Sequence, residues 1–224
     1  MQICPSMPEP TMEALAATIN RLSLYYNYFQ IDIGDGIYVN NRTVQIDEIM
    51  NNFSRFDNRQ NLYFDFHLMV SDFEADIVKL NLLKRSMQIK NIFIHYSAIS
   101  DFSVWPQEKI LGLSSIPIGL TLNPEDHITD LTDHFTLHTI PCIQIMSVTP
   151  GVQGNPFLPD TLLKIEQLRV FGYKSKIFLD GAVNDKTLPI INRLKYKPDI
   201  LCPGSFLTKA KDLKKNVEYL ESFN

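Results

Sequence analysis

The sequence has few of the features that mark secreted or membrane proteins. Its three cysteines, Cys4, Cys142 and Cys202, show no CxxC spacing. We expect them to be buried small side chains in a reducing compartment. No stretch reaches the roughly 18 apolar residues that span a membrane. The first ten residues lack the charged start and long apolar run of a signal peptide, so we expect a cytoplasmic protein without a membrane partner.

Charge of one sign is also scarce. The chain has 21 Lys and Arg against 25 Asp and Glu, a formal net charge of −4, and no block of basic residues. This distribution argues against a nucleic-acid groove. No linker, low-complexity tract or repeat divides the chain, so residues 1–224 are predicted to form a single domain. Such a length can bury a sizeable core.

What the sequence does contain is a regular alternation of strand and helix patterns. Strands alternating with helices predict a parallel sheet. Eight such units close into a (β/α)₈ TIM barrel, which typically takes about 250 residues, so this chain would form a compact one. The expected strands cover residues 2–6, 28–33, 62–69, 91–95, 118–122, 142–146, 176–180 and 200–202, and the expected helices 12–22, 46–53, 72–83, 101–111, 125–138, 158–171, 184–194 and 208–220.

The segment Tyr28–Asn41, YFQIDIGDGIYVNN, is the one around which the chain is organised. Gln30 and Asp32 lie two residues apart on a strand, so both side chains point the same way. The glycines that follow, Gly34 and Gly36, break the strand sharply. α/β enzymes often present catalytic groups as a carboxylate at the end of a strand, just before such a loop. An aspartate that caps a turn would give the same pattern.

A second carboxylate, Asp180, ends the seventh expected strand. Barrel closure would place Asp32 and Asp180 across the mouth from each other, an arrangement suited to inverting a stereocentre by proton removal and return. Removing a proton next to a carbonyl leaves an ene-diolate, whose negative oxygens need a positive partner. A metal held by Asp32, His67 and Asp180 would supply that charge. Turn caps and a hydrogen-bonded core histidine are the alternatives, and spacing alone does not separate them.

Small-residue loops follow the last three expected strands. Barrels often bind a phosphate after strands seven and eight, on backbone N–H groups, and glycine lets the backbone approach the anion. Ordinary turns would account for each loop taken singly. The loops are Gly151–Asn155, Gly181-Ala182 and Gly204-Ser205.

These residues occur in segments that resemble the ribulose-phosphate 3-epimerase family, which includes pentulose- and hexulose-phosphate 3-epimerases. The likeness runs from end to end in the family's order. It is carried by CPSM at Cys4–Met7, QIDIGDGIYVNN at Gln30–Asn41, DFHLM at Asp65–Met69, IHYSA at Ile94–Ala98, LNP at Leu122–Pro124, MSVTPGVQGNPF at Met146–Phe157, LDGAV at Leu179–Val183 and PGS at Pro203–Ser205.

The resemblance implies a TIM-barrel isomerase of carbohydrate metabolism that acts on a phosphorylated ketose, such as ribulose 5-phosphate, through a metal-bound ene-diolate. The metal would be zinc, or iron, manganese or cobalt, and we expect a homo-oligomer. By family match, the catalytic residues would be Asp32 and Asp180, the metal ligands Asp32, His67 and Asp180, the substrate contacts Ser6, His67, Met69, Met146, Gly151 and Gly154, and the phosphate contacts Gly181, Ala182, Gly204 and Ser205.

The departures from the family pattern gather around one pocket. Gln30 stands where the family has a second histidine ligand, and a neutral amide oxygen is a poorer zinc ligand than imidazole. We therefore expect weaker metal binding or a shift toward harder ions. Gly34 replaces a methionine, Ala182 replaces a glycine, and the loop 147–157 lacks its usual phenylalanine and second adjacent glycine. A sugar-phosphate-binding paralogue without turnover is the alternative; a lyase or isomerase sharing only the phosphate site would leave the two aspartates without a role.

Overall fold

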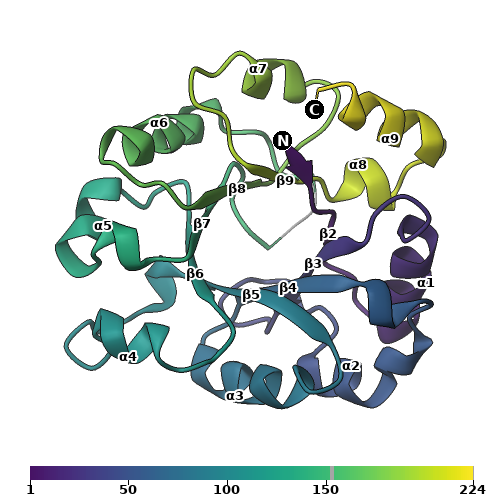
Figure 1. Ribbon diagram of the computed structural model, residues 1–224, viewed down its shortest axis with the longest axis horizontal. Helices are drawn as coiled ribbons and strands as arrows, with labels where there is room; N and C mark the ends of the chain where they lie inside the picture. Colours follow the sequence, from purple (N-terminus) through teal and green to yellow (C-terminus); the bar gives the residue numbers. More distant parts are fainter. Residues whose placement is uncertain (152–153, 224) are drawn as a thin grey trace.

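The computed structural model describes residues 1–151 and 154–223. Its strands form one ring in which every neighbouring pair is parallel, and Figure 1 looks along the axis of that ring. Around the ring the strands follow the order of the sequence. They are β1 Gln2–Ile3, β2 Ser6–Met7, β3 Tyr28–Gly34, β4 Tyr63–Met69, β5 Gln88–His95, β6 Ile118–Leu122, β7 Cys142–Met146, β8 Lys176–Asp180 and β9 Ile200–Cys202.

The barrel closes through its first strand, which Pro5 divides into β1 and β2. β1 pairs with β9 on one side, and β2 pairs with β3 on the other. Between them the Cys4 amide donates to the Leu201 carbonyl at 2.9 Å, and the Pro5 carbonyl accepts from the Gln30 amide at 2.9 Å. Proline has no N–H to give to a ladder, yet the segment still bridges both neighbours. The predicted (β/α)₈ TIM barrel is confirmed.

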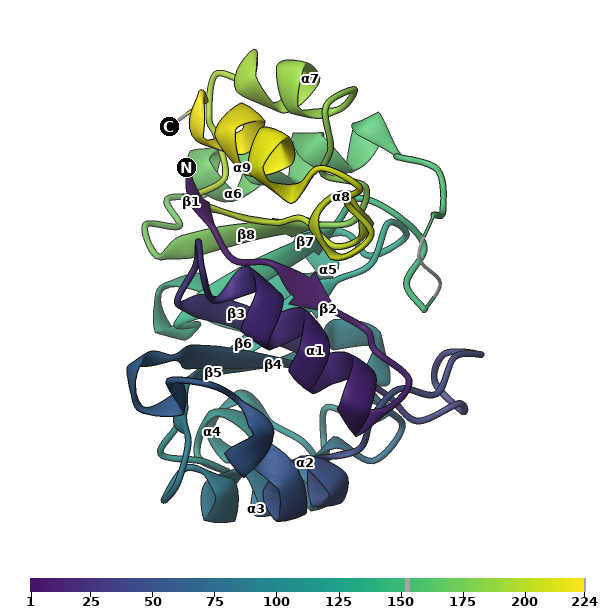
Figure 2. The same cartoon turned by 90° about the vertical axis from the view of Figure 1, so that its right-hand side faces the viewer.

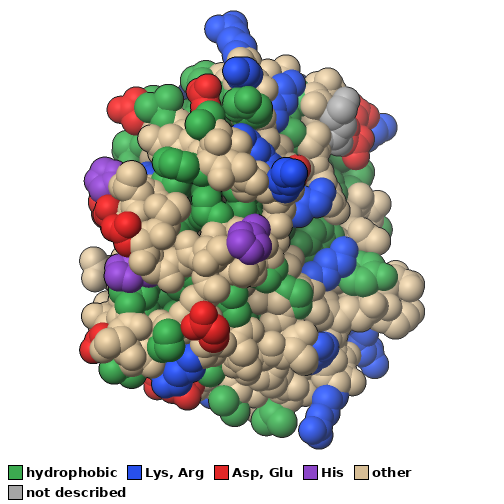
Figure 3. All heavy atoms as spheres, turned by 60° about the vertical axis from the view of Figure 1, so that its left-hand side comes forward, with side chains coloured by type: hydrophobic (Ala, Val, Ile, Leu, Met, Phe, Trp, Pro, Cys, Tyr) green, Lys and Arg blue, Asp and Glu red, His purple; other side chains and the backbone are tan. Residues whose placement is uncertain are grey.

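Helices surround the ring of strands on its outside, as Figure 1 shows. No helix in the described part of the chain is long and apolar enough to cross a membrane. On the face that Figure 3 brings forward, acidic and basic side chains are interspersed with hydrophobic ones. The helices are α1 Met12–Leu22, α2 Ile46–Asn52, α3 Phe73–Leu83, α4 Gln107–Leu111, α5 Ile128–His134, α6 Leu163–Val170, α7 Leu188–Asn192, α8 Ser205–Thr208 and α9 Leu213–Glu221.

Five helices start later than expected: those expected from residues 101, 125, 158, 184 and 208 begin at Gln107, Ile128, Leu163, Leu188 and Leu213. At the last two, aspartate and asparagine side chains compete for backbone amides. The helix expected from Thr208 begins only at Leu213, where the Asp212 carboxylate accepts the amide three residues on. Asn184 is the first residue of the helix expected over residues 184–194. Its side chain instead accepts amides two and three residues on, at 2.9 and 3.3 Å, which closes a separate turn before α7. Such local bonds compete with helix formation.

Side chains alternate between the barrel interior and the helix layer. On β4, Phe64, Phe66 and Leu68 join the main core with the helices, whereas Asp65 and His67 turn inward. The interior of the barrel is filled by a second cluster that contains all three cysteines, which are free and buried as expected. The members of that cluster are Cys4, Tyr28, Phe93, Cys142, Phe178, Ile200 and Cys202.

Asp65 is an ionisable group inside this interior, at 0% exposure. It accepts from the Tyr28 hydroxyl and, at 2.8 Å, from the Asn91 side chain. Burial nevertheless raises the pKa of Asp65 from 3.8 to about 7. A folded-state pKa above the unfolded one favours the folded form at low pH, and that stability is lost as pH rises from about 4 to about 7.

We therefore expect Asp65→Asn to flatten the pH dependence of stability. The free energy of unfolding of the parent should fall between pH 4 and pH 8 by about 4 kcal/mol more than that of the variant. Urea unfolding at the two pH values measures this difference. An equal fall in both proteins would show that the Asp65 carboxyl does not carry the effect.

The carboxyl ends of the strands all face one end of the barrel. Figure 2 shows the loops after β3 and β7 projecting from that end, while both chain termini lie at the other. In TIM barrels the functional groups occupy this face. The candidate site is found there.

Candidate active site

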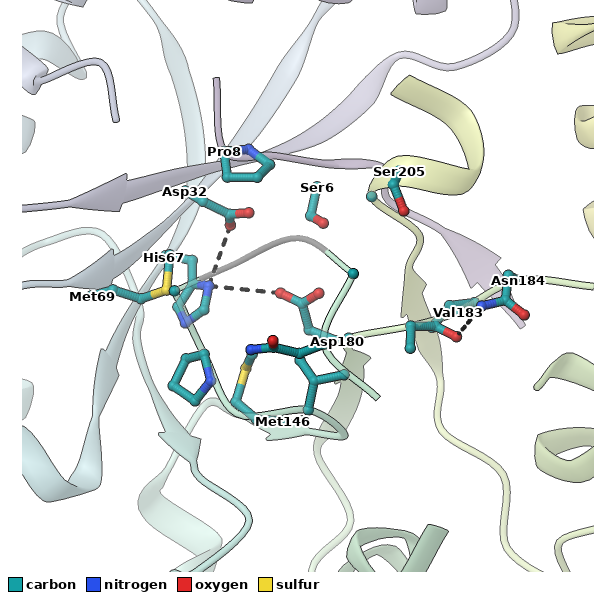
Figure 4. Close-up of a pocket in the computed structure, with 18 residues that line it drawn as sticks. Ser6, Pro8, Asp32, His67, Met69, Met146, Asp180, Val183, Asn184 and Ser205 are labelled. Atoms are coloured by element: carbon teal, nitrogen blue, oxygen red, sulfur yellow. Dashed lines mark hydrogen bonds and ion pairs between the residues drawn. The ribbon is translucent and has the colours of Figure 1, made fainter. Parts of the chain in front are cut away.

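A cavity of about 200 Å³ opens at this end of the barrel. Every residue predicted from the sequence to contact metal, substrate or phosphate lines it (Figure 4). Gln30 lies beneath, fully buried. The predicted residues that line the cavity are Ser6, Asp32, His67, Met69, Met146, Gly151, Gly154, Asp180, Gly181, Ala182, Gly204 and Ser205.

The cavity has two chemically different sides. Asp32, His67 and Asp180 point toward one another at one side, whereas Asn184 and Ser205 lie at the other (Figure 4). The first three come from strand ends and are nearly inaccessible to solvent. The second side is made of loop backbone and small residues after β8 and β9.

Four polar atoms meet at the first side. The Gln30 amide nitrogen donates to Asp32 Oδ1 at 2.9 Å and to Asp180 Oδ2 at 2.7 Å. His67 Nδ1 lies 3.2 Å from Asp32 Oδ1, 3.6 Å from Asp180 Oδ2 and 3.5 Å from Gln30 Nε2. The amide thus ties the two carboxylates together from below.

The spacing of these atoms fits a divalent cation. Ligands about 2.0–2.1 Å from a tetrahedral ion lie roughly 3.3 Å apart, and His67 Nδ1 lies 3.2 Å from Asp32 Oδ1 and 3.6 Å from Asp180 Oδ2. Ligand atoms of Asp32, His67 and Asp180 all lie within 4.8 Å of one another. The Gln30 amide nitrogen lies where a fourth ligand would be needed, but it has no free lone pair to offer a metal. A half-turn of the Gln30 amide would bring its oxygen there, away from the Cys202 thiol that donates to it at 3.5 Å.

The two carboxylates influence each other. Burial first, and then the charge of Asp32, raise the pKa of Asp180 from 3.8 to about 7. Close carboxylates in a dry pocket do not both ionise easily. The Gln30 N–H groups and the His67 ring oppose this shift. A group with a pKa near neutrality can both take and give a proton under ordinary conditions.

Gln144 is a buried neighbour of Asp180 that sequence reasoning missed. Its amide nitrogen lies 3.2 Å from Asp180 Oδ2 and 3.7 Å from the Met146 sulfur. The alternation along CIQIM, Cys142–Met146, places Gln144 inward on the same face as Met146, and this signal could have found it. Asp180 therefore accepts from two amides. Asn155, from the predicted loop Gly151–Asn155, also lines the cavity, and lining residues that were not anticipated are Pro8, Val148, Pro150, Val183 and Asn184.

The loop after β8 has unusual backbone conformations. Gly181 has φ +106°, and a Cβ there would lie 2.6 Å from a methyl group of Val148. Ala182 has φ +50°, in the left-handed region, which costs a non-glycine residue about 1 kcal/mol. The Ser147 hydroxyl bonds the carbonyls of Asp180 and Gly181, at 3.0 and 2.5 Å, and fixes the end of the strand.

Opposite effects are expected from exchanging the residue type at these two positions. Ala182→Gly should raise the free energy of unfolding by up to about 1 kcal/mol, because strain is relieved at some cost in chain entropy. Gly181→Ala should lower it by about 1–3 kcal/mol through the contact with Val148. Thermal unfolding of both variants checks this. If Ala182→Gly lost as much stability as Gly181→Ala, backbone strain would not distinguish the positions.

The loop after β3 explains one departure from the family pattern. A Cβ at Gly34 would lie 2.5 Å from the Asn41 carbonyl oxygen, so the backbone occupies the place of a side chain. The same loop carries Val39, which a Cβ on Gly151 would approach to 2.8 Å. The loops after β3 and β7 therefore touch. Within the predicted substrate loop, residues 152 and 153 lie outside the described residues.

Comparisons with known proteins agree with this geometry. Residues 2–205 match the family model described as "Ribulose-phosphate 3 epimerase family". A ribulose-phosphate 3-epimerase of Helicobacter pylori is 27% identical over 229 residues, 99% of this chain and 97% of the relative. One of Methanocaldococcus jannaschii is 26% identical over 199 residues, covering 87% of this chain and 78% of the relative.

Solved structures support the same fold. The 3-hexulose-6-phosphate synthase of Salmonella typhimurium superposes with a TM-score of 0.66 at 12% identity, covering 100% of this chain and 98% of that one. KGPDC from Streptococcus mutans in complex with D-R5P gives a TM-score of 0.66 at 11% identity, covering 99% and 95%. At such identities these likenesses concern the fold alone.

Proposed function

Because the chain belongs to the ribulose-phosphate 3-epimerase family, we propose that it inverts carbon 3 of a ketose phosphate by proton transfer between Asp32 and Asp180. Family membership makes the chain a carbohydrate isomerase and implies a phosphorylated sugar as substrate. The observation that carries the proposed mechanism is the meeting of both carboxylates with His67 at one side of the cavity.

In this mechanism one carboxylate removes the proton from carbon 3, and the electron pair of that bond moves toward the carbon 2 carbonyl to give an ene-diolate. The other carboxyl group returns a proton to the opposite face of carbon 3. The step requires one ionised and one protonated carboxyl group, a state favoured by the raised pKa of Asp180, about 7. Microscopic reversibility then lets the pair work in both directions.

The rest of the cavity would orient the substrate and exclude water. Met69 and Met146, 5% and 4% exposed, offer an apolar wall beside the reacting carbon. The phosphate would lie against the backbone of Gly181, Ala182, Gly204 and Ser205 on the other side. Holding both ends of the substrate places carbon 3 between the aspartates.

Asp32, His67 and Asp180, with the Gln30 amide oxygen as fourth donor, would hold a divalent ion. Its charge would stabilise the negative charge that develops on the substrate oxygens. This donor set has one imidazole and three oxygens, so it should suit harder ions such as manganese better than a set with two imidazoles would.

Incubation with ribulose 5-phosphate and with a hexulose 6-phosphate in D₂O, with and without added manganese or zinc, tests the proposal. We expect deuterium at carbon 3, followed by NMR, and less of it after treatment with a chelator. Asp32→Asn is the matched control and should take up deuterium about 10³-fold more slowly. Absence of label at carbon 3 across these sugars and metals would refute the epimerase activity.

A second candidate function is a sugar-phosphate-binding barrel without turnover. The observation that favours it is Gln30, whose N–H₂ occupies the corner where a metal ligand would lie. This function predicts that sugar phosphates raise the melting temperature of the protein although no deuterium enters carbon 3. The same incubation therefore separates the two candidates.

A further inference from the structure

A line of polar side chains, buried at His67, His95 and Asn123, leads from the candidate active site to the loop after β3. His67 Nε2 lies 2.8 Å from His95 Nε2, and His95 Nδ1 lies 2.8 Å from Asn123 Oδ1. The Asn123 amide nitrogen then donates to the Tyr38 hydroxyl at 2.9 Å and to the Ser97 hydroxyl at 2.8 Å. His67, His95 and Asn123 are 1%, 0% and 4% exposed. Nothing in the mechanism above uses the last two.

Counting protons gives this line a direction. Tyr38 and Ser97 also bond to each other, at 2.7 Å, so one hydroxyl must give its proton to the other. If the Asn123 oxygen faced the two hydroxyls, it would need both of their protons, and none would remain for their mutual bond. The Asn123 nitrogen must therefore face the hydroxyls. Its oxygen faces His95 and can only accept.

His95 must consequently carry a proton on Nδ1. The ring is fully buried, and its nitrogens face an amide oxygen and a second imidazole, with the Tyr38 ring packed at 4.9 Å. None of these contacts is a carboxylate that would balance a second proton. A ring with one proton has a bare Nε2. The 2.8 Å contact then requires the proton of His67 Nε2.

We propose that His95 and Asn123 are positioning residues that fix the His67 proton on Nε2 and leave Nδ1 to hold a cation beside Asp32 and Asp180. Outer hydrogen bonds of this kind orient metal-ligating imidazoles and select their tautomer. The effect of the His67 tautomer on metal binding rests on the proposed function. The order of the hydrogen bonds does not. Tyr38 lies in the loop after β3, the strand that carries Asp32, so the line ties that loop to the His67 ring.

The hydrogen-bond order is tested on the metal-free protein labelled with ¹⁵N-histidine. Long-range ¹H–¹⁵N spectra should show a protonated Nδ1 and bare Nε2 for His95, and a protonated Nε2 for His67. The His67 Nε2 proton should exchange slowly with solvent and disappear in His95→Phe. A protonated Nε2 on His95 would overturn the proposal, whatever the protein binds or catalyses.

The positioning role is tested with a matched pair of variants. In His95→Gln the amide oxygen can still accept from His67 and the nitrogen can still donate to Asn123, whereas His95→Phe keeps a ring without either group. Equilibrium dialysis against manganese and zinc should give His95→Gln within a few-fold of the parent and His95→Phe about 10–100-fold weaker. Melting of the metal-free variants confirms that each is folded.

The outcomes separate this proposal from the proposed function. Equal affinity in the parent and a folded His95→Phe would refute the positioning role, and so would equal losses in both variants, since packing would then explain them. If the parent bound neither ion, the metal-dependent part of the proposed function would fail. The nitrogen spectra would still decide the hydrogen-bond order.

Discussion

Asp180→Asn is expected to lower kcat by about 10³-fold or more while the barrel stays folded. An amide of the same size cannot take up or release a proton, and a positioned acid or base contributes about 10²–10⁴-fold to a rate. The same substitution removes a ligand of the proposed ion, which adds to the loss. Steady-state turnover of the active ketose phosphate, alongside the parent, measures the effect.

Stability provides the control for this variant. Burial and the charge of Asp32 raise the pKa of Asp180 to about 7, so the ionised carboxylate is unfavourable in the metal-free protein. Asp180→Asn should therefore melt no lower than the metal-free parent at pH 8. Asp32→Asn should show a similar loss of turnover, and the double variant little further loss, because the pair acts as a unit. If the fold loss in kcat of the double variant equalled the product of the two single losses, the two-base mechanism would be contradicted.

The strands were predictable wherever short apolar runs are bounded by strong turn formers. β6, β7, β8 and β9 have the predicted bounds, because buried parallel strands are continuous apolar runs that end at residues such as Pro124 and Gly181. The first strand differs, since Pro5 removes one amide from a ladder that otherwise continues. Helix starts were less predictable, because Asn184 and Asp212 can each close a turn or cap a helix.

The meeting of three polar side chains was predictable because barrel closure brings strand ends together, whereas the substrate contacts were expected only from the family resemblance. Asp32, His67 and Asp180 lie far apart in sequence, yet each is inward-facing near the end of its strand. The distances and hydrogen-bond directions in the site could not be predicted, because they depend on the register between strands and on side-chain rotation. Hence the sequence marked Gln30 as a departure from the family without indicating that its nitrogen bridges the carboxylates.

Gln30→His is expected to tighten zinc binding by on the order of 10²-fold. Changes outside the ligands already alter metal affinity about 10–100-fold, and a ligand should matter at least as much. In the parent, binding requires the Gln30 amide to give up two bonds to carboxylates, at 2.9 and 2.7 Å, and to present a weaker donor. Imidazole offers a free nitrogen to zinc. Competition with a chromogenic chelator measures the two affinities.

Gln30→Leu is the matched control, because it keeps the bulk of residue 30 but neither donates nor accepts. It should bind zinc more weakly than the parent, since the amide oxygen is lost, and its metal-free form should be less stable at pH 8. That loss of stability follows because Asp32 and Asp180 would face each other without a shared N–H donor. Equal zinc affinity in Gln30→Leu and the parent would mean that the amide never turns its oxygen to the ion. In that case Gln30 acts only as the tie between the two carboxylates, and the ion, if bound, has three protein ligands.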